Sequence, residues 1–305
     1  MEERSAESEP DQEEADDDES MYSSDDDDYQ FLTEQEHAWA VEIKAAAEAP
    51  DSGILPMSDF SYVQYALVTK GRLEEALARI KGVQQFQSHY QVSDDPSRGI
   101  SVIEQFMALQ PRALLNLDIC LEQDRGEGVI AFDASQYNPS LAETLSPEHA
   151  DPEHNWKIHI LFWYYAVRAV QIDFRAIRQG IVLLVDTAGM DWSNVDMSHE
   201  QRCFVELRKH YPWIAKETRV YNCSFVACMW ISMLKAFIQS QHSQAIQMAC
   251  EIGHHGGQQR DPNLPRRKLS DLYLQPNANR AARYLLSSAR ELLNERHENE
   301  QSFRL

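Results

Sequence analysis

The sequence lacks the motifs from which most enzyme assignments begin. It contains no Gly-Lys dipeptide, and so no phosphate-binding loop in which a lysine follows a glycine-rich turn. It also has no G-x-S-x-G, no H-E-x-x-H and no pair of Cys-x-x-Cys knuckles, which leaves serine hydrolases and zinc enzymes without a starting residue. We therefore expect a protein that is not an enzyme, holds no metal and needs no cofactor.

Cysteines are few and follow no pattern. The five cysteines are Cys120, Cys203, Cys223, Cys228 and Cys250. Their number is odd, and their spacing matches neither a disulfide framework nor a recognised zinc site. The first residues also lack the positively charged and apolar stretches of a secretory signal. We expect reduced thiols and a cytoplasmic location.

Long hydrophobic runs are missing as well. The longest candidate, Ile158–Val170, contains His159 and Arg168 and is shorter than the 18 or more apolar residues of a transmembrane helix. We expect any membrane contact to be transient and peripheral.

Basic residues are scarce: 28 lysines and arginines stand against 49 acidic residues, for a net charge of −21. Residues 1–28 hold 15 of the acids and only Arg4, a local charge of −14 that leaves −7 for the rest. Such a run repels itself and has little to bury, so residues 1–30 are predicted to be a disordered acidic tail. It is a solubilising segment, a dock for a basic protein partner, or a phosphorylation site at Ser20, Ser23 or Ser24. Nucleic acid is not expected as a partner, because phosphate binding needs clustered cations.

The apolar pattern predicts helices from Leu32 to about Leu117 and then strands that alternate with helices. This order indicates an α/β fold with a mostly parallel sheet flanked by helices. The expected strands are 126–133, 180–186, 218–224 and 244–252, and the expected helices between and after them are 156–171, 198–212, 225–238 and 277–298. The last of these helices is amphipathic and is expected to dock on the core or on a neighbouring surface.

The segment GIVLLVDTAGMDW, residues 180–192, resembles the Asp-x-x-Gly corner of nucleotide-hydrolysing switch proteins. A nucleotide site also needs a phosphate-binding loop, which this sequence lacks, so the corner alone does not indicate nucleotide binding. We therefore interpret Asp186 and Gly189 as a structural turn, in which the aspartate accepts turn amides and the glycine supplies an unusual backbone conformation.

The order of segments from Gly126 to Ile252 resembles the lipid-binding domain of the CRAL-TRIO family, of the α-tocopherol transfer protein and yeast phosphatidylinositol transfer protein type. Members show a strand ending in Asp-x-x-Gly, a helix running into Tyr-Pro, a strand ending in Asn-Ala-Pro and a helix ending near Lys-Pro-Phe-Leu. The matching positions here are Asp186 and Gly189, Tyr211 and Pro212, Asn222, and Lys235 with Phe237.

The resemblance implies a mixed sheet that encloses an apolar cavity, preceded by an all-helical N-terminal lobe. The domains implied are a helical lobe at 31–118, a lipid-binding domain at 119–265, and a C-terminal extension with an amphipathic helix at 266–305. The implied function is non-catalytic binding or transfer of a small hydrophobic lipid in a cavity gated by the mobile helix 225–238. Left in water, a sixteen-carbon chain costs about 13 kcal/mol, so a carrier must enclose it.

The residues implied for lipid binding are mostly apolar and come from two helices and one strand. They are Phe162, Val182, Leu184, Phe225, Met229, Trp230, Met233, Lys235 and Phe237. Ordinary core packing explains the aromatic cluster around Phe162 and the apolar stripe of the later helix equally well. The ligand classes left open are phospholipid, isoprenoid and sterol-like lipids, since Arg202 lies near the position where relatives that bind phosphatidylinositol carry an acid.

An alternative also stays open. The family's proline is replaced by Ser224 in one motif and by Ala236 in the other. These departures fit a protein-interaction module that keeps the fold but has lost lipid binding, and that is recruited through the acidic tail or the C-terminal helix.

Overall fold

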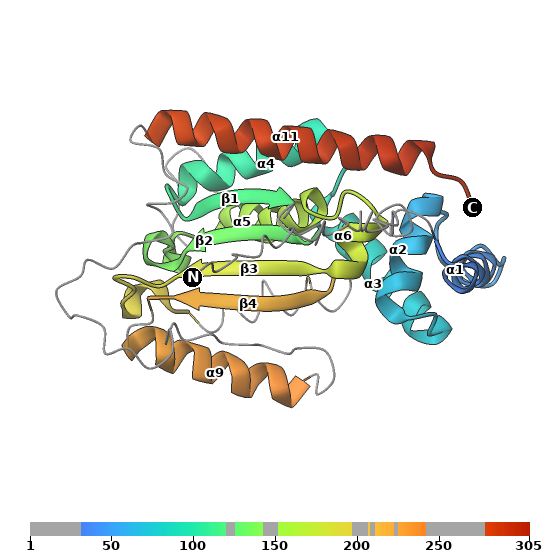
Figure 1. Cartoon of the computed structure of the whole chain (residues 1–305), viewed down its shortest axis with the longest axis horizontal. Helices are drawn as coiled ribbons and strands as arrows, with labels where there is room; N and C mark the ends of the chain where they lie inside the picture. The colour runs from blue at the N-terminus through green and yellow to red at the C-terminus, as the bar shows by residue number, and fades with distance from the viewer. Residues whose placement is uncertain are drawn as a thin grey trace, which may run out of the picture.

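The computed structural model describes residues 32–119, 126–142, 152–196, 207, 211–222, 225–241 and 278–305 (Figure 1). The expected strand 244–252, most of the expected helix 198–212 and the acidic tail lie outside these ranges. The described part is a mixed α/β fold around one four-stranded sheet. Its elements are α1 (Glu34–Ala47), α2 (Asp59–Thr69), α3 (Leu73–Tyr90), α4 (Pro96–Leu109), β1 (Leu114–Ile119), β2 (Gly128–Asp133), the 3-10 turns η2 (Ala134–Gln136) and η3 (Pro139–Ala142), α5 (Pro152–Ala169), α6 (Phe174–Gln179), β3 (Ile181–Asp186), the 3-10 turn η4 (Trp192–Asn194), β4 (Ala215–Tyr221), α9 (Phe225–Gln241) and α11 (Ala278–Ser302).

Short polar side chains set the starts of the N-terminal helices. Thr33 and Glu36 form a reciprocal capping box at α1, in which each side chain accepts from the other residue's backbone N–H. Ser58 caps α2 by accepting from the Ser61 N–H, and Asp95 caps α4 just before its first-turn proline. Each cap satisfies a backbone donor that the helix itself leaves unpaired.

The sheet has the order β1-β2-β3-β4. Strand β1 runs antiparallel to β2, and β2, β3 and β4 run parallel to one another. Because parallel neighbours need a crossover, the chain between β2 and β3 carries α5 and α6, and the two strands pair in register from Gly128 with Ile181 to Asp133 with Asp186. The predicted strands at 126–133 and 180–186 are confirmed, and that at 218–224 lies at 215–221 in the structure.

One large apolar core joins the N-terminal helices, the sheet and α11. Helix α5 runs behind the sheet in Figure 1 and buries its aromatic run from Phe162 to Tyr165. Helices α4, α5 and α11 approach closely at Gly99, where an added Cβ would lie 2.8 Å from the Tyr165 ring and 2.9 Å from Leu293. A side chain at residue 99 would therefore push these helices apart.

Helix α11 lies along α4 and the edge strand β1 (Figure 1). Its buried residues repeat at helical spacing, as expected for an amphipathic helix that docks on the core: Leu285, Ala289, Leu292, Leu293, Arg296 and Glu300. The Ser288 hydroxyl donates to the Leu117 carbonyl, and the backbone N–H of Leu305 donates to Asp59. Of the two docking places expected for the C-terminal helix, the core and a neighbouring surface, the structure shows the core.

The helical assignment up to Leu117 is wrong for its last residues. Residues Leu114–Ile119 form β1, which pairs with β2 across a bulge between Leu114 and Asn116. The strand was missed because it is rich in leucine, a good helix former, and has no β-branched residue before Ile119. The domain boundary expected at residue 118 falls inside this strand.

Candidate functional site

The predicted lipid-binding residues lie on different sides of the sheet. Successive side chains of a strand point to opposite faces, and Ile181 belongs to the large core together with Phe162. Val182 and Leu184 therefore face away from α5. There, Leu184 packs with Leu115 and Ala131 in a separate small cluster. Among the described residues, this cluster contains strand residues only.

Phe162 is part of the packed core rather than of the opposite face. It is fully buried, and its ring stacks on that of Phe106 from α4 with the centroids 3.6 Å apart and the planes 7° apart. Trp163 packs against it at 5.2 Å. The aromatic cluster of α5 is thus ordinary core, which is one of the two interpretations that its sequence allows.

Helix α9 presents part of its apolar stripe to solvent. Phe225 is 76% exposed and Met229 is 42% exposed, whereas Trp230 and Met233 are half-buried. Trp230 packs at the carboxyl end of the strands against a cluster formed by Ala134, Val185, Met190, Val195 and Ala227, which we call the carboxyl-end cluster. Lys235 and Phe237 lie in α9, but their side chains, like Arg202, fall outside the description.

Two further exposed aromatic residues lie near the carboxyl ends of parallel strands. Trp192 is 54% exposed in η4, which follows β3, and Tyr221, the last residue of β4, is 36% exposed. Helix α9 begins at this same end of the sheet (Figure 1). Four of the seven large apolar side chains that are exposed in the described residues thus gather here. Trp192, Tyr221, Phe225 and Met229 form what we call the apolar end.

The Asp-x-x-Gly corner is a structural turn, as predicted. Asp186 is fully buried, and its Oδ1 accepts from the Ala188 N–H at 2.9 Å and from the Asn222 side chain at 3.1 Å. The Thr187 hydroxyl donates to the Tyr221 carbonyl at 2.9 Å. Gly189 has a φ of +81°, which L side chains rarely adopt. The corner therefore ties the end of β3 to the end of β4.

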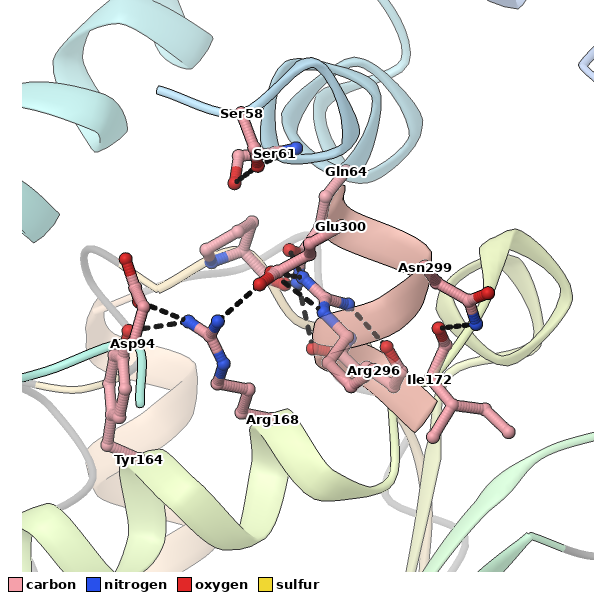
Figure 2. A network of polar contacts seen from close by, with 12 residues as sticks. Ser58, Ser61, Gln64, Asp94, Tyr164, Arg168, Ile172, Arg296, Asn299 and Glu300 are labelled. Atoms are coloured by element: carbon pink, nitrogen blue, oxygen red, sulfur yellow. Dashed lines mark hydrogen bonds and ion pairs between the residues drawn. The ribbon is translucent and has the colours of Figure 1, made fainter. Parts of the chain in front are cut away.

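A second region of interest is a buried polar network at the other end of the sheet, where α2, α5 and α11 meet (Figure 2). Glu300 of α11 is 7% exposed and binds two arginines at once. It accepts from the Nη2 of Arg168, and from the Nε of Arg296 at 2.9 Å. The second Arg168 nitrogen lies 2.7 Å from Asp94 at the protein surface. The network thus links three elements that are far apart in sequence.

Arg296 is the most deeply buried charge of this network, at 1% exposure. Its guanidinium donates to the side-chain oxygen of Gln64 at 2.6 Å and to the carbonyl of Gln171, and it lies 4.1 Å above the Phe60 ring. Gln64 in turn donates to the Pro212 carbonyl at 2.9 Å. Hydrogen bonds and a cation–π contact therefore compensate the loss of water around this cation.

The charges in this network stabilise one another. Burial alone would raise the pKa of Glu300, but Arg296 and Arg168 outweigh it and hold the pKa below its usual value. Burial likewise disfavours a charged Arg168, yet its interactions with Tyr164 and Glu300 raise its pKa. Glu300 is therefore ionised at neutral pH between two cations.

A pocket of about 400 Å³ opens beside the network. Its walls come from α2, α3, α5, α11 and the segment that connects α1 to α2. They include Arg168, Arg296, Glu300, Tyr164 and Tyr211, and none of the predicted lipid-binding residues lines it. This pocket was not predicted from the sequence, although charged residues on the apolar stripes of two helices were a signal for it.

No protein family model matches the chain, and no curated protein matches it either. Within the described ranges, no group of three metal-binding side chains occurs. In the same ranges, no helix has the length and apolar character needed to cross a bilayer. Cys228 is a free, exposed thiol.

Proposed function

We propose that this protein binds a small hydrophobic lipid without catalysing a reaction, and that it exchanges the lipid at membranes through the apolar end. The ligand sits in an internal cavity on the sheet face that carries Val182 and Leu184, and α9 acts as the gate of this cavity. The helices α1 to α4 act as an N-terminal lobe that supports this domain. The observation that carries the proposal is the exposure of Phe225 and Met229 beside Trp192 and Tyr221.

Isolated apolar residues are common on a protein surface, but several of them at one end of a sheet favour contact with a membrane, a protein or a ligand. Aromatic residues are also the type that prefers the interface between headgroups and acyl chains. Because the chain carries a net charge of −21, the membrane contact is apolar rather than electrostatic.

The sheet face opposite α5 offers a floor for the ligand. Leu184 is only half-buried there, and its described neighbours Leu115 and Ala131 belong to strands. A strand face of this kind must be covered, and a lipid chain would cover it with a matching apolar surface. The order of motifs that resembles the CRAL-TRIO family leads to the same arrangement.

Binding to vesicles tests the membrane part of the proposal. Full burial of a Phe side chain contributes about 2 kcal/mol. If Phe225 buries half of its side chain in the membrane, Phe225→Ser loses about 1 kcal/mol of binding free energy, which weakens binding roughly fivefold. The measurement is co-sedimentation with neutral phosphatidylcholine vesicles. Tyr284→Ser is the matched control, because Tyr284 is 66% exposed on α11, away from α9. Equal binding by the wild-type protein and Phe225→Ser would contradict the membrane contact.

The ligand itself is tested by native mass spectrometry of the purified protein, followed by solvent extraction. We expect a hydrophobic adduct of one lipid per chain, and we expect Leu184→Asp to abolish it. A protein free of adduct that also takes up no phospholipid, isoprenoid or sterol would overturn lipid binding. In that case the apolar end would have to be a surface for another protein.

A further inference from the structure

We propose a second ligand site: the pocket between α2, α3, α5 and α11 binds a small organic acid, whose acidic group is held by Tyr211, Tyr164 and Arg168. The site shares no residue with the lipid site proposed above and does not depend on it. Three observations carry the proposal: a buried hydroxyl without a partner, an arginine held by an exchangeable carboxylate, and a mixed polar and apolar wall.

The hydroxyl of Tyr211 is the first observation. Tyr211 is 4% exposed and lines the pocket, but its hydroxyl finds no hydrogen-bond partner among the described residues. A buried polar group without a partner is rare in folded proteins, because it loses its hydrogen bonds to water and gains no hydrogen bond within the protein. Burial raises the pKa of this phenol, so it keeps its proton and acts as a donor. The hydroxyl is thus a hydrogen-bond donor that no described group satisfies, on a residue that lines the pocket.

Tyr164 lies beside Tyr211, and the two ring centroids are 4.9 Å apart. Its hydroxyl oxygen accepts from the Gln87 side chain at 3.1 Å and from Arg168 at 3.4 Å. The phenol proton is therefore left to donate, and the described residues supply no acceptor for it. Burial raises the pKa of Tyr164 too, so both phenols keep their protons.

Arg168 supplies the positive charge. Its pairing with Glu300 is buried, but its other partner, Asp94, is 67% exposed. Water and salt weaken an exposed pair of this kind, so a carboxylate or phosphate from solution competes with Asp94 on comparable terms. Without Asp94, the two buried arginines face only one carboxylate, and the pocket has an excess of one positive charge.

The rest of the wall defines the remainder of the ligand. A pocket of about 400 Å³ is larger than a bare oxyanion needs and falls in the range of small-molecule sites. The lining also includes apolar side chains: Leu55, Pro56, Met57, Val83 and Val92. Ser58 and Ser61, at the start of α2, add hydroxyl groups. The chemistry selects an acidic head, carboxylate or phosphate monoester, attached to a small apolar body.

The test is isothermal titration calorimetry of the full-length protein with benzoate and with phenyl phosphate. Benzamide, which has the shape of benzoate without its charge, is the control ligand. We expect at least one of the two anions to bind at millimolar concentration or tighter, and benzamide to bind at least tenfold more weakly. Absence of binding by both anions, or equal binding of benzamide and benzoate, overturns the proposal.

Tyr211→Phe removes only the unpartnered hydroxyl. We expect the affinity for the anion to fall about tenfold while the thermal stability stays the same or rises, because no existing hydrogen bond is lost. Tyr137→Phe is the matched control: the Tyr137 hydroxyl contacts His159 at 3.2 Å outside the pocket, so its loss leaves anion affinity unchanged. Unchanged affinity in Tyr211→Phe contradicts the proposed site.

Asp94→Asn tests the exchange at Arg168. Removal of the competing carboxylate is expected to tighten anion binding about threefold. Weaker binding in this variant would mean that the anion does not take the place of Asp94, and would refute the role given to Arg168. Because Asp94 is on the surface, this variant is expected to fold normally.

Discussion

Glu300→Gln is the sharpest perturbation of the polar network that attaches α11. The substitution keeps the size of the side chain but removes the buried carboxylate that Arg168 and Arg296 share. Arg168 then keeps the exposed carboxylate of Asp94 and the neutral Tyr164 hydroxyl, and Arg296 keeps the neutral acceptors Gln64 and Gln171. Two buried cations are left without full compensation.

Removing one member of a buried ion pair typically costs 3–5 kcal/mol, because the remaining charge stays out of water. Glutamine retains one acceptor, so we expect the lower end, about 3 kcal/mol of unfolding free energy. For a folded unit of this size, that corresponds to a fall in Tm of roughly 5 °C. Replacing the pair by apolar groups, as in Arg168→Met with Glu300→Leu, should cost less than Glu300→Gln alone.

Urea unfolding followed by circular dichroism measures these differences, with Glu298→Gln as the control. Glu298 is exposed on the same helix, so the same loss of charge there should change stability by less than about 0.5 kcal/mol. Equal stability of Glu300→Gln and Glu298→Gln would refute the reasoning.

The pH dependence of the unfolding free energy gives a second check. Because the pKa of Glu300 is lowered in the folded state, its contribution is fully present above about pH 4.5 and is lost as the pH falls through that lowered pKa.

Three other substitutions test the fold. Glu36 accepts two bonds of 2.9 and 2.7 Å from Arg178, and Glu36→Gln removes the negative charge and one of the two acceptors. It should cost about 2 kcal/mol in urea unfolding, and an unchanged midpoint would show that α1 is not held by this pair. Gly128→Ala places a Cβ 2.5 Å from the Val170 carbonyl and should lower Tm by several degrees, and a stable variant would disprove this close approach. Asp186→Asn should cost about 1 kcal/mol in urea unfolding and leave vesicle binding intact, whereas lost binding would give the corner a functional role.

The parts of the fold that the sequence predicts are those with strong local signals. Strands β2 and β3 are short apolar runs bounded by glycine, and β3 is rich in β-branched residues. Helix α11 was recognisable because its apolar residues recur on one face. Strand β1 has leucines instead, and its conformation is decided by pairing with β2 rather than by local preference.

The polar network could not be predicted from local sequence patterns, because its members are far apart in the chain. Arg296 and Gln64 lie 232 residues apart, and nothing in either segment encodes their contact. Periodicity predicts that the apolar face of a helix is buried, but it does not say which helix covers it. The same limit applies to Phe162, whose burial was predictable and whose stacking on Phe106 was not.

Apolar side chains are usually buried and charged ones exposed, and helices α9 and α11 each depart from this rule in opposite ways. Helix α11 buries Arg296 and Glu300, and their mutual contacts compensate for this. Helix α9 exposes Phe225 and Met229, an exposure that no described contact offsets. Departures from local consistency tend to mark functional positions, and an exposed side chain contributes little to folding. A loss of vesicle binding in Phe225→Ser therefore reports a lost contact with the membrane and not a lost fold.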